Sequence, residues 1–293
     1  MRVLPASFKQ RNRKRARDVH PMPITISALY RYPIKGCKGH ALAEAQTDAR
    51  GIAGDRSLMI VDTANEFITQ RDVPALALIT PVLADNAITL TAPGMPALTF
   101  APTNDGPCVR ARVWRDVCDA VDQGDDVAQW LQDFLAAPVR LVRMADGYER
   151  KCDPKYARSE RDQVGFADAY PFLLISQASL DDLNARLNAP APMNRFRPNI
   201  VVSGCEPFAE DIWCDIRIAG VDFGVVKPCA RCNVPTIDQD TAVAGQEPIK
   251  TLASYRTINQ KVMFGQNLIA SNAGVLRVGD EVEVIRLASS NQG

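Results

Sequence analysis

The sequence has only two histidines, no long apolar run and no excess of charge of either sign. Lys plus Arg and Asp plus Glu both number 34, so the chain has no overall electrostatic attraction for nucleic acid or for an anionic membrane. No stretch approaches the roughly 20 apolar residues that span a bilayer. We therefore expect a cytoplasmic protein with no nucleic-acid or membrane partner, in which any anion site is built locally from individual Lys and Arg residues.

Cysteine is present but sparse. Eight cysteines are scattered over 293 residues, without the density of a small disulfide-stapled scaffold, so we expect reduced thiols. Cys229 and Cys232 form the one close pair. Zinc would need two more N or S ligands, and the only histidines are His20 and His40, which disfavours a zinc site. The segment Asn233-Val234-Pro235 disfavours a helix after Cys232, and hence a redox dithiol. Two structural thiols stay open as an alternative.

Sequence signatures of a second redox module are also missing. The chain contains no Gly-X-Gly-X-X-Gly fingerprint for a dinucleotide, and its cysteines do not follow ferredoxin spacings. If the protein catalyses a redox reaction, its electrons must come from another protein. We expect that partner to be a separate haem or iron–sulfur carrier.

Size and composition favour one large domain or two closely packed ones, since 46% of the residues are hydrophobic. Residues 1–22 are rich in Lys and Arg without an apolar face, which predicts a disordered basic extension. It would be a solvated tail or precede a true start at Met22, and a nucleic-acid-binding or organelle-targeting tail stays open as an alternative. We expect a first domain at residues 23–145 and a second at 146–293. The boundary falls in residues 146–163, which are highly charged and lack periodicity.

The hydrophobic pattern is mainly that of short strands separated by turn residues. It predicts strands at residues 24–30, 56–61, 77–82, 87–90, 109–114, 199–202, 214–218, 221–226, 266–270 and 281–285. One helix is expected at about residues 176–187. Another opens at Asp125 and places four apolar residues on one face, namely Val127, Trp130, Leu131 and Phe134. The pattern therefore predicts a mainly β fold with a few helices, whose antiparallel strands close into a barrel or a sandwich. The fold class that we expect is two packed barrel-like domains.

Residues 227–232, Lys-Pro-Cys-Ala-Arg-Cys, follow a predicted strand. A soft thiolate beside cationic side chains suits a metal carried by an anionic organic cofactor. The run resembles the molybdenum-binding loop of MOSC-domain proteins, in particular the amidoxime-reducing component family, whose pattern is Cys-X-Arg-Cys followed by a Thr and an Asp. Further segments resemble that family in the same order, at residues 32–39, 54–56, 69–71, 171–176, 196–205 and 264–266. The resemblance covers about residues 25–286 and implies an MOSC N-terminal barrel followed by an MOSC catalytic domain.

By this resemblance, Cys232 is the catalytic residue and the protein ligand to the metal of a molybdenum cofactor, Mo-molybdopterin. Pyridoxal phosphate is not expected. The resemblance further implies a set of cofactor-binding residues: Lys35, Gly36, Arg56, Asp168, Arg197, Asn199, Ala230, Arg231 and Asn267. Arginines suit this role because they bind phosphate through two parallel hydrogen bonds. Pro198 predicts an extended backbone at Arg197, which would aim Arg197 and Asn199 at one groove.

Two segments depart from the family's pattern. Gly36 stands where a hydroxyl residue is usual, and Asn233-Val234-Pro235 replaces a commoner apolar and Thr-containing run. One hydrogen bond to the cofactor is then either missing or supplied by the backbone. Cys205 also matches a family cysteine, and we expect it to be structural because it follows a predicted strand and is partly buried.

The resemblance implies reduction of N-hydroxylated compounds, such as amidoximes, hydroxylamines and hydroxylated base analogues, to the parent amidine or amine and water. The metal would supply the redox chemistry, while the protein would bind and orient the cofactor and control access. Two alternatives stay open. A sulfur carrier or molybdenum-cofactor carrier would use the same Cys232, and a non-catalytic binding module would keep the fold without the metal.

Overall fold

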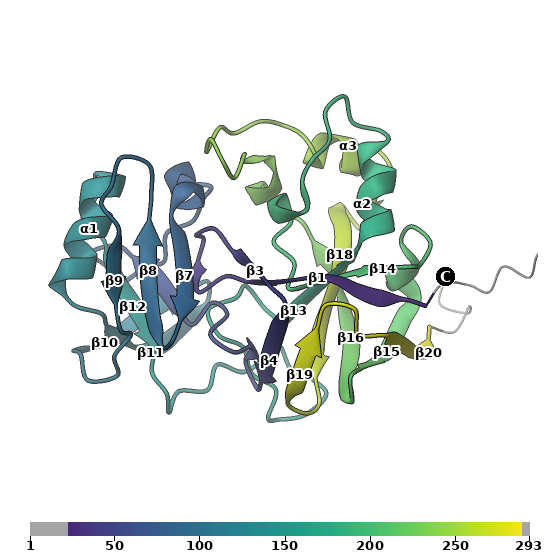
Figure 1. The fold of residues 1–293 in the computed structure, drawn as a ribbon, viewed down its shortest axis with the longest axis horizontal. Coiled ribbons are helices and arrows are strands. Elements are labelled where there is room, and N and C mark those ends of the chain that lie inside the picture. Colours follow the sequence, from purple (N-terminus) through teal and green to yellow (C-terminus); the bar gives the residue numbers. More distant parts are fainter. Residues whose placement is uncertain (1–22, 289–293) are drawn as a thin grey trace, which may run out of the picture.

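The computed structural model describes residues 23–288, and the basic extension expected at residues 1–22 lies outside them. Two lobes lie side by side (Figure 1). The first lobe, residues 58–144, holds β6 (Leu58–Val61), β7 (Thr80–Ala84), β8 (Ala87–Thr91), β9 (Leu98–Phe100), β10 (Cys108–Val113), β11 (Asp116–Asp122), α1 (Asp125–Leu135) and β12 (Arg140–Met144). No helix in the described part of the chain is both long and apolar enough to cross a membrane.

The second lobe, residues 172–287, is built on the largest sheet. It holds β13 (Phe172–Ser176), α2 (Gln177–Asn184), β14 (Ile200–Ser203), β15 (Trp213–Ile218), β16 (Val221–Ala230), α3 (Ile249–Ala253), β17 (Thr257–Ile258), β18 (Lys261–Ala270), β19 (Gly274–Arg277) and β20 (Val282–Leu287). The sheet also includes β1 (Thr25–Arg31) and β3 (His40–Leu42) from the N-terminal segment. Its strand order is β20-β15-β16-β18-β13-β14-β1-β3, with β17 paired to β18. Strands thus dominate both lobes, and the mainly β fold expected from the sequence is confirmed.

The N-terminal strands join the two lobes. They are β1 (Thr25–Arg31), β2 (Ile34–Lys35), β3 (His40–Leu42), β4 (Glu44–Asp48) and β5 (Gly51–Ile52). Strand β1 pairs antiparallel with β14 of the second lobe, where the purple ribbon lies beside green strands in Figure 1. Strand β2 pairs in parallel with β6 of the first lobe, and β4 pairs with β19 of the second. The segment between Lys35 and Arg56 is therefore held at the junction of the lobes.

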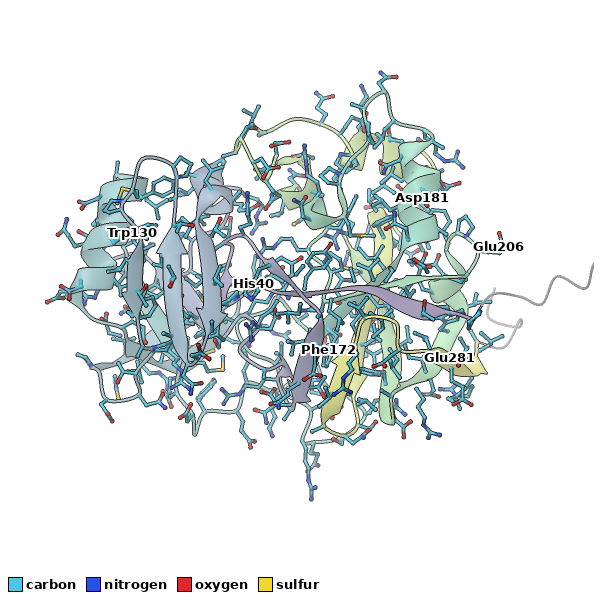
Figure 2. All side chains as sticks on the ribbon, viewed as in Figure 1. His40, Trp130, Phe172, Asp181, Glu206 and Glu281 are labelled. Carbon is cyan, nitrogen blue, oxygen red and sulfur yellow. The ribbon has the colours of Figure 1, made fainter. Side chains whose placement is uncertain are left out.

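Each lobe has its own hydrophobic core. Helix α1 packs its apolar face, including Val127 and Leu131, against the first lobe, and Figure 2 shows Trp130 on the same helix. Phe172 lies in the core of the second lobe, where its ring meets that of Phe223 edge to face at 5.3 Å. Such aromatic pairs contribute about 0.5–1.5 kcal/mol beyond their buried area. Both cores thus fix the strands whose ends meet between the lobes.

Several elements differ from the sequence prediction. The strand expected to start at Ala77 was wrong at its beginning, because residues Pro74–Leu78 form a 3₁₀ helix, η1. Pro74 favours that start, since its fixed φ suits a first helical turn. Helix α2 begins as expected, with the Ser176 hydroxyl accepting a hydrogen bond from the Ser179 amide, but it ends at Asn184 rather than at residue 187. Tight turns between residues 183 and 187 close it.

Strand β16 is longer than the sequence predicted, and this changes the setting of the cysteine pair. The strand runs on to Ala230, so Lys227 and Cys229 belong to it rather than to a loop. Its pairing with β18 shifts register between Val225 and Lys227 and again between Pro228 and Ala230. Bulges of this kind re-aim side chains and accommodate a proline that cannot donate to the ladder. Cys232 then lies just beyond the strand end, before a short 3₁₀ helix, η4 (Val234–Thr236).

Candidate functional site

A cavity of about 290 Å³ lies between the two lobes. Its walls come from the segment around β2, residues 67–71, the β10–β11 turn, the stretches before β13 and β14, the end of β16 with the residues after it, and Asn267 in β18. All ten residues that the sequence assigned to the site line it: Lys35, Gly36, Arg56, Asp168, Arg197, Asn199, Ala230, Arg231, Cys232 and Asn267. Residues up to 232 positions apart in the chain, from Lys35 to Asn267, are thereby brought together.

The cavity has a buried side and an open side. Lys35 and Asn199 are only 8% and 1% exposed, so they mark its inner wall. Asp168, Trp114 and Cys232 also line the cavity but are exposed, so they lie at its opening. The thiol of Cys232 therefore meets both solvent and the cationic interior.

Two arginines of the site share one aromatic ring. The guanidinium carbons of Arg56 and Arg197 lie 4.2 and 4.4 Å from the centroid of the Tyr32 ring. The Tyr32 hydroxyl donates to the carbonyl oxygen of Pro198 at 3.1 Å, which fixes the ring. Gly39 leaves room for it, because a Cβ there would lie 2.3 Å from a Tyr32 ring carbon. Cation–π attraction of this kind stabilises two guanidiniums at close quarters.

Arg56 is neutralised within the protein. Its Nη1 donates to the buried Asp55 carboxylate at 2.6 Å and to Asn199 Oδ1 at 3.1 Å. Burial alone would lower the pKa of Arg56, but the Asp55 carboxylate raises it. The Asn199 amide also accepts from the Leu173 amide and donates to the Tyr30 carbonyl oxygen. Asn199 is thus well placed to position Arg56, with its own amide already engaged by protein groups.

Arg197 carries its charge with little compensation. Burial and the nearby Arg56 guanidinium lower the pKa of Arg197 to about 10, so it is still protonated at neutral pH. The extended backbone expected before Pro198 was wrong, since Arg197 has a φ of 57°, in the left-handed region. The amide of Arg197 donates to the carbonyl oxygen of Asn194, closing a turn that directs the chain back into the cavity wall.

Lys35 and Asp168 form an ion pair across the cavity wall. Burial would raise the pKa of Asp168, yet Lys35 and a hydrogen bond from Trp114 hold it well below its usual range. Burial lowers the pKa of Lys35, and Asp168 opposes that shift. Gly36, next to Lys35, has a φ of 85°, and its carbonyl oxygen accepts a hydrogen bond from the Gln70 side chain at 2.6 Å. This left-handed turn explains glycine where the family pattern has a hydroxyl residue.

The cysteine segment is ordered by Arg231. Its guanidinium donates to Cys229 Sγ at 3.1 Å and to the Phe196 carbonyl oxygen at 2.8 Å. Nε of the same side chain is buried and has no hydrogen-bond partner among residues 23–288. Asn267 donates to the Lys227 carbonyl oxygen at 3.1 Å, which ties β18 to the bulged part of β16. Cys205 is partly buried against the second lobe's core, away from the cavity lining, in keeping with the structural role expected for it.

Charge in the cavity is strongly one-sided. Six cationic side chains line it, namely Lys35, Arg56, Arg71, Arg197, Lys227 and Arg231, against one carboxylate, that of Asp168. Three non-glycine lining residues also have left-handed backbone, with φ of 42° at Arg56, 56° at Trp114 and 57° at Arg197. Each such residue costs on the order of 1–3 kcal/mol, and such strain gathers at functional sites. The cavity is therefore built to bind an anion.

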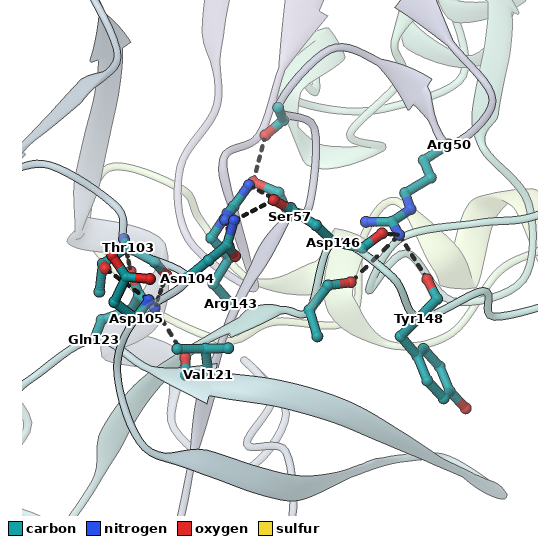
Figure 3. A network of polar contacts seen from close by, with 12 residues as sticks. Arg50, Ser57, Thr103, Asn104, Asp105, Val121, Gln123, Arg143, Asp146 and Tyr148 are labelled. Atoms are coloured by element: carbon teal, nitrogen blue, oxygen red, sulfur yellow. Dashed lines mark hydrogen bonds and ion pairs between the residues drawn. The ribbon is translucent and has the colours of Figure 1, made fainter.

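A larger cleft of about 920 Å³ lies elsewhere between the lobes, but its polar groups bond to one another. Arg143 binds Asn104 and Asp146, and Arg50 donates to the carbonyl oxygens of Asp146 and Tyr148 (Figure 3). Its lining holds three arginines and five carboxylates. This cleft therefore lacks the excess of cations that would suit an anionic ligand.

Sequence reasoning missed three aromatic residues of the cavity. Phe67, Trp114 and Tyr170 line it, as does Arg71, for which the sequence indicated only a place in the matching segment 69–71. Phe67 and Tyr170 carry no signal in a single sequence, because buried and half-buried aromatics are common in any core. Trp114 was placed at the end of a strand, although it begins a turn, since the turn lacks the usual glycine or asparagine.

The fold and the site together define a mostly β protein of two lobes, with a cationic, thiol-bearing cavity between them. Residues 23–138 match the MOSC N-terminal beta barrel domain, and residues 161–283 match the MOSC domain. Mitochondrial amidoxime-reducing component 1 from Mus musculus is 35% identical, over 94% of this chain and 86% of that protein. Its counterpart from Homo sapiens is 34% identical, over 89% and 83%. The chain belongs to the family of MOSC-domain proteins that includes the amidoxime-reducing components, which confirms the resemblance seen in the sequence.

Similarity to solved structures is weaker. The YUAD protein from Bacillus subtilis aligns over 89% of this chain and 95% of that chain, with 12% identity and a TM-score of 0.40.

Proposed function

We propose that this protein is an oxidoreductase that reduces N-hydroxylated compounds, namely amidoximes, hydroxylamines and N-hydroxylated base analogues. An amidoxime takes up two electrons and two protons, its N–O bond breaks, and the products are the amidine and water. The observation that carries the proposal is the cavity, in which six cationic side chains and one carboxylate surround a path to the exposed Cys232. Relatives named amidoxime-reducing components, 34–35% identical to this chain, support the choice of substrate class.

The residues present fit a molybdenum cofactor. No group of three or more His, Cys, Asp or Glu side chains within residues 23–288 is arranged to hold a metal ion alone. A metal bound at Cys232 would then need its other ligands from an organic cofactor, and the dithiolene sulfurs of molybdopterin are suitable donors. The excess of cations matches the negative charge of the cofactor phosphate, and the buried Nε of Arg231, which lacks a partner in the described part of the chain, offers one further donor.

The residues that line the cavity would have different roles toward the cofactor. When bound, the cofactor supplies the two-electron redox chemistry. The Cys232 thiolate would be the metal ligand, and Lys35, Arg197 and Arg231 would bind the phosphate and pterin. Gly36 and Ala230 would approach the cofactor through their backbones, and Asn267 would hold the bulged strand in place. Arg56, paired with Asp55 and Asn199, would support Arg197 through the shared Tyr32 ring.

We also propose an electron donor, a location in the cell and a domain boundary. The electrons come from a separate haem or iron–sulfur carrier that docks near the cavity opening, because Cys229 and Cys232 are the only cysteines in the lining and no second redox motif occurs in the sequence. The protein acts in the cytoplasm. The domain boundary lies at residues 145/146, within the stretch between the two family matches at 23–138 and 161–283.

A carrier of sulfur or of molybdenum cofactor is the second candidate, since the exposed thiol of Cys232 would also suit a transferable group. A persulfide carrier, however, needs no array of cations around its sulfur. A cofactor carrier would bind the same cofactor but would not reduce a substrate. Turnover therefore separates the two functions.

The test is an anaerobic assay of the cofactor-loaded protein with reduced methyl viologen and an alkyl or aryl amidoxime. We expect viologen oxidation that matches amidine formation. Cys232→Ser should abolish the reaction, whereas Cys108→Ser, which changes another exposed cysteine outside the cavity, should not. Failure of the loaded protein to reduce any of several N-hydroxylated compounds would favour the carrier.

A further inference from the structure

Trp114 occupies a turn for which tryptophan is a poor choice. Val113 pairs with Asp116, so Trp114 and Arg115 form a two-residue hairpin turn between β10 and β11. The φ of Trp114 is 56°, a left-handed value that glycine or asparagine adopts at much lower cost. A local folding preference does not account for tryptophan at this position.

The indole ring of Trp114 is held in place at the cavity opening. Its Nε1 donates to Asp168 Oδ1 at 3.1 Å, and its ring meets Phe67 at 4.9 Å and 61°. The guanidinium carbon of Arg71 lies 4.9 Å from the ring centroid. Trp114 is nevertheless 42% exposed, so part of the ring is available for contact with another molecule. A large exposed apolar ring fixed at a cavity edge is typical of ligand recognition.

Arg71 brings a cation to the same edge. It is exposed and lines the cavity. Its guanidinium contacts Thr69 Oγ1 at 3.4 Å and forms no ion pair with any carboxylate of residues 23–288 within 4.0 Å. The indole contact fixes its position without neutralising its charge. Lys35, in contrast, is 8% exposed on the inner wall, where the cofactor is proposed to bind.

We propose that Trp114 and Arg71 form a substrate-selectivity subsite that takes planar aromatic N-hydroxylated compounds with an anionic substituent. The aromatic ring of the substrate stacks on the indole, and the anion binds the Arg71 guanidinium. Trp114 contacts both Arg71 and Asp168, and these residues line the same cavity as the exposed Cys232. The inference rests on the proposed function, because it assigns the substrate class of that same cavity.

Three amidoximes test the subsite in turnover: a neutral aryl amidoxime, its para-carboxylate derivative and an alkyl amidoxime. The wild type should prefer the aryl carboxylate. Trp114→Gly suits the turn and should fold, yet it should reduce the aryl-over-alkyl ratio of kcat/KM about 5-fold through the loss of stacking. Arg71→Gln should reduce the carboxylate-over-neutral ratio about 10-fold, mostly in KM, and that preference should weaken with salt.

The matched control is Arg115→Ala. Arg115 neighbours Trp114 on the same turn, is 79% exposed and does not line the cavity, so its loss should leave both ratios as in the wild type. If Trp114→Gly and Arg71→Gln also keep the wild-type ratios, the subsite is overturned.

A binding measurement keeps the inference separate from turnover. Trp130 and Trp213 are 6% and 5% exposed, so quenching by a bound aryl compound should report mainly on Trp114. Titration with the para-carboxylate amidoxime should give saturable quenching that is weakened in Arg71→Gln and absent in Trp114→Gly. Quenching without turnover supports the subsite and contradicts the proposed function, whereas turnover without saturable quenching overturns the subsite alone.

Discussion

The guanidinium carbon of Arg197 lies 4.4 Å from the centroid of the Tyr32 ring. The guanidinium carbon of Arg56 lies 4.2 Å from the same centroid, although the two cations repel each other. Tyr32 is 2% exposed and hydrogen-bonded to the Pro198 carbonyl oxygen. The ring is therefore a shared platform, and the geometry of the anion site depends on a residue that carries no charge.

Gly39→Ala should disturb this platform. A Cβ at Gly39 would lie 2.3 Å from a Tyr32 ring carbon, so the ring must shift, and overpacking of this kind costs about 1–3 kcal/mol. Urea unfolding should show the lower stability, and cofactor content should fall with it. Gly147→Ala is the control, because nothing lies within 4 Å of a Cβ there. Equal unfolding midpoints for the two variants would show that Gly39 does not hold Tyr32 in place.

Thiol labelling should separate the cavity cysteine from the buried ones. Cys232 and Cys108 are exposed, whereas Cys37 is buried. Burial, only partly opposed by Arg197, raises the pKa of Cys37 to about 12. Iodoacetamide at about pH 8 should therefore modify Cys232 and Cys108 in the native protein and spare Cys37 until unfolding. Mass spectrometry of digests provides the measurement. After cofactor loading, Cys232 should become protected and Cys108 should not; the opposite pattern would remove Cys232 from the site.

Asp168→Asn should change the acid dependence of stability. The pKa of Asp168 lies below its unfolded value of about 3.9, so its stabilising contribution is complete well above that value and is lost as pH falls through the folded one. The stability difference between wild type and variant should thus be largest above about pH 5 and narrow below about pH 4. The side chain is 66% exposed, so solvent screening keeps the effect small. Urea midpoints between about pH 3 and pH 6 test this; a constant difference would contradict the pairing.

Much of the fold was predictable because each lobe is built from locally patterned strands. The stripe of Val127, Trp130 and Leu131 predicted α1 correctly. The pattern failed where the backbone departs from regular periodicity. Residues 77 and 78 continue an apolar run but lie in a 3₁₀ helix, and β16 continues through Pro228 because register shifts absorb the proline.

The site was predictable from the resemblance and not from spacing. No periodic pattern joins Lys35, Arg56 and Arg197, which meet only because β2 pairs with the first lobe while β1 pairs with the second. Local rules also misjudged Arg197, where Pro198 indicated an extended backbone but tertiary contacts hold a φ of 57°. Local rules do not predict Trp114 for the same reason. Its strained turn is stabilised by contacts with Asp168 and Phe67 and not by the turn propensity of tryptophan.

The most direct test of the account is the molybdenum content of three proteins made in one host that synthesises the cofactor. Wild type and Cys108→Ser should each contain about one molybdenum per chain, and Cys232→Ser should contain little or none, because Cys232 is the proposed thiolate ligand. A wild-type protein without molybdenum, or a Cys232→Ser variant that retains it in full, would contradict the assignment of this cavity as a molybdenum-cofactor site.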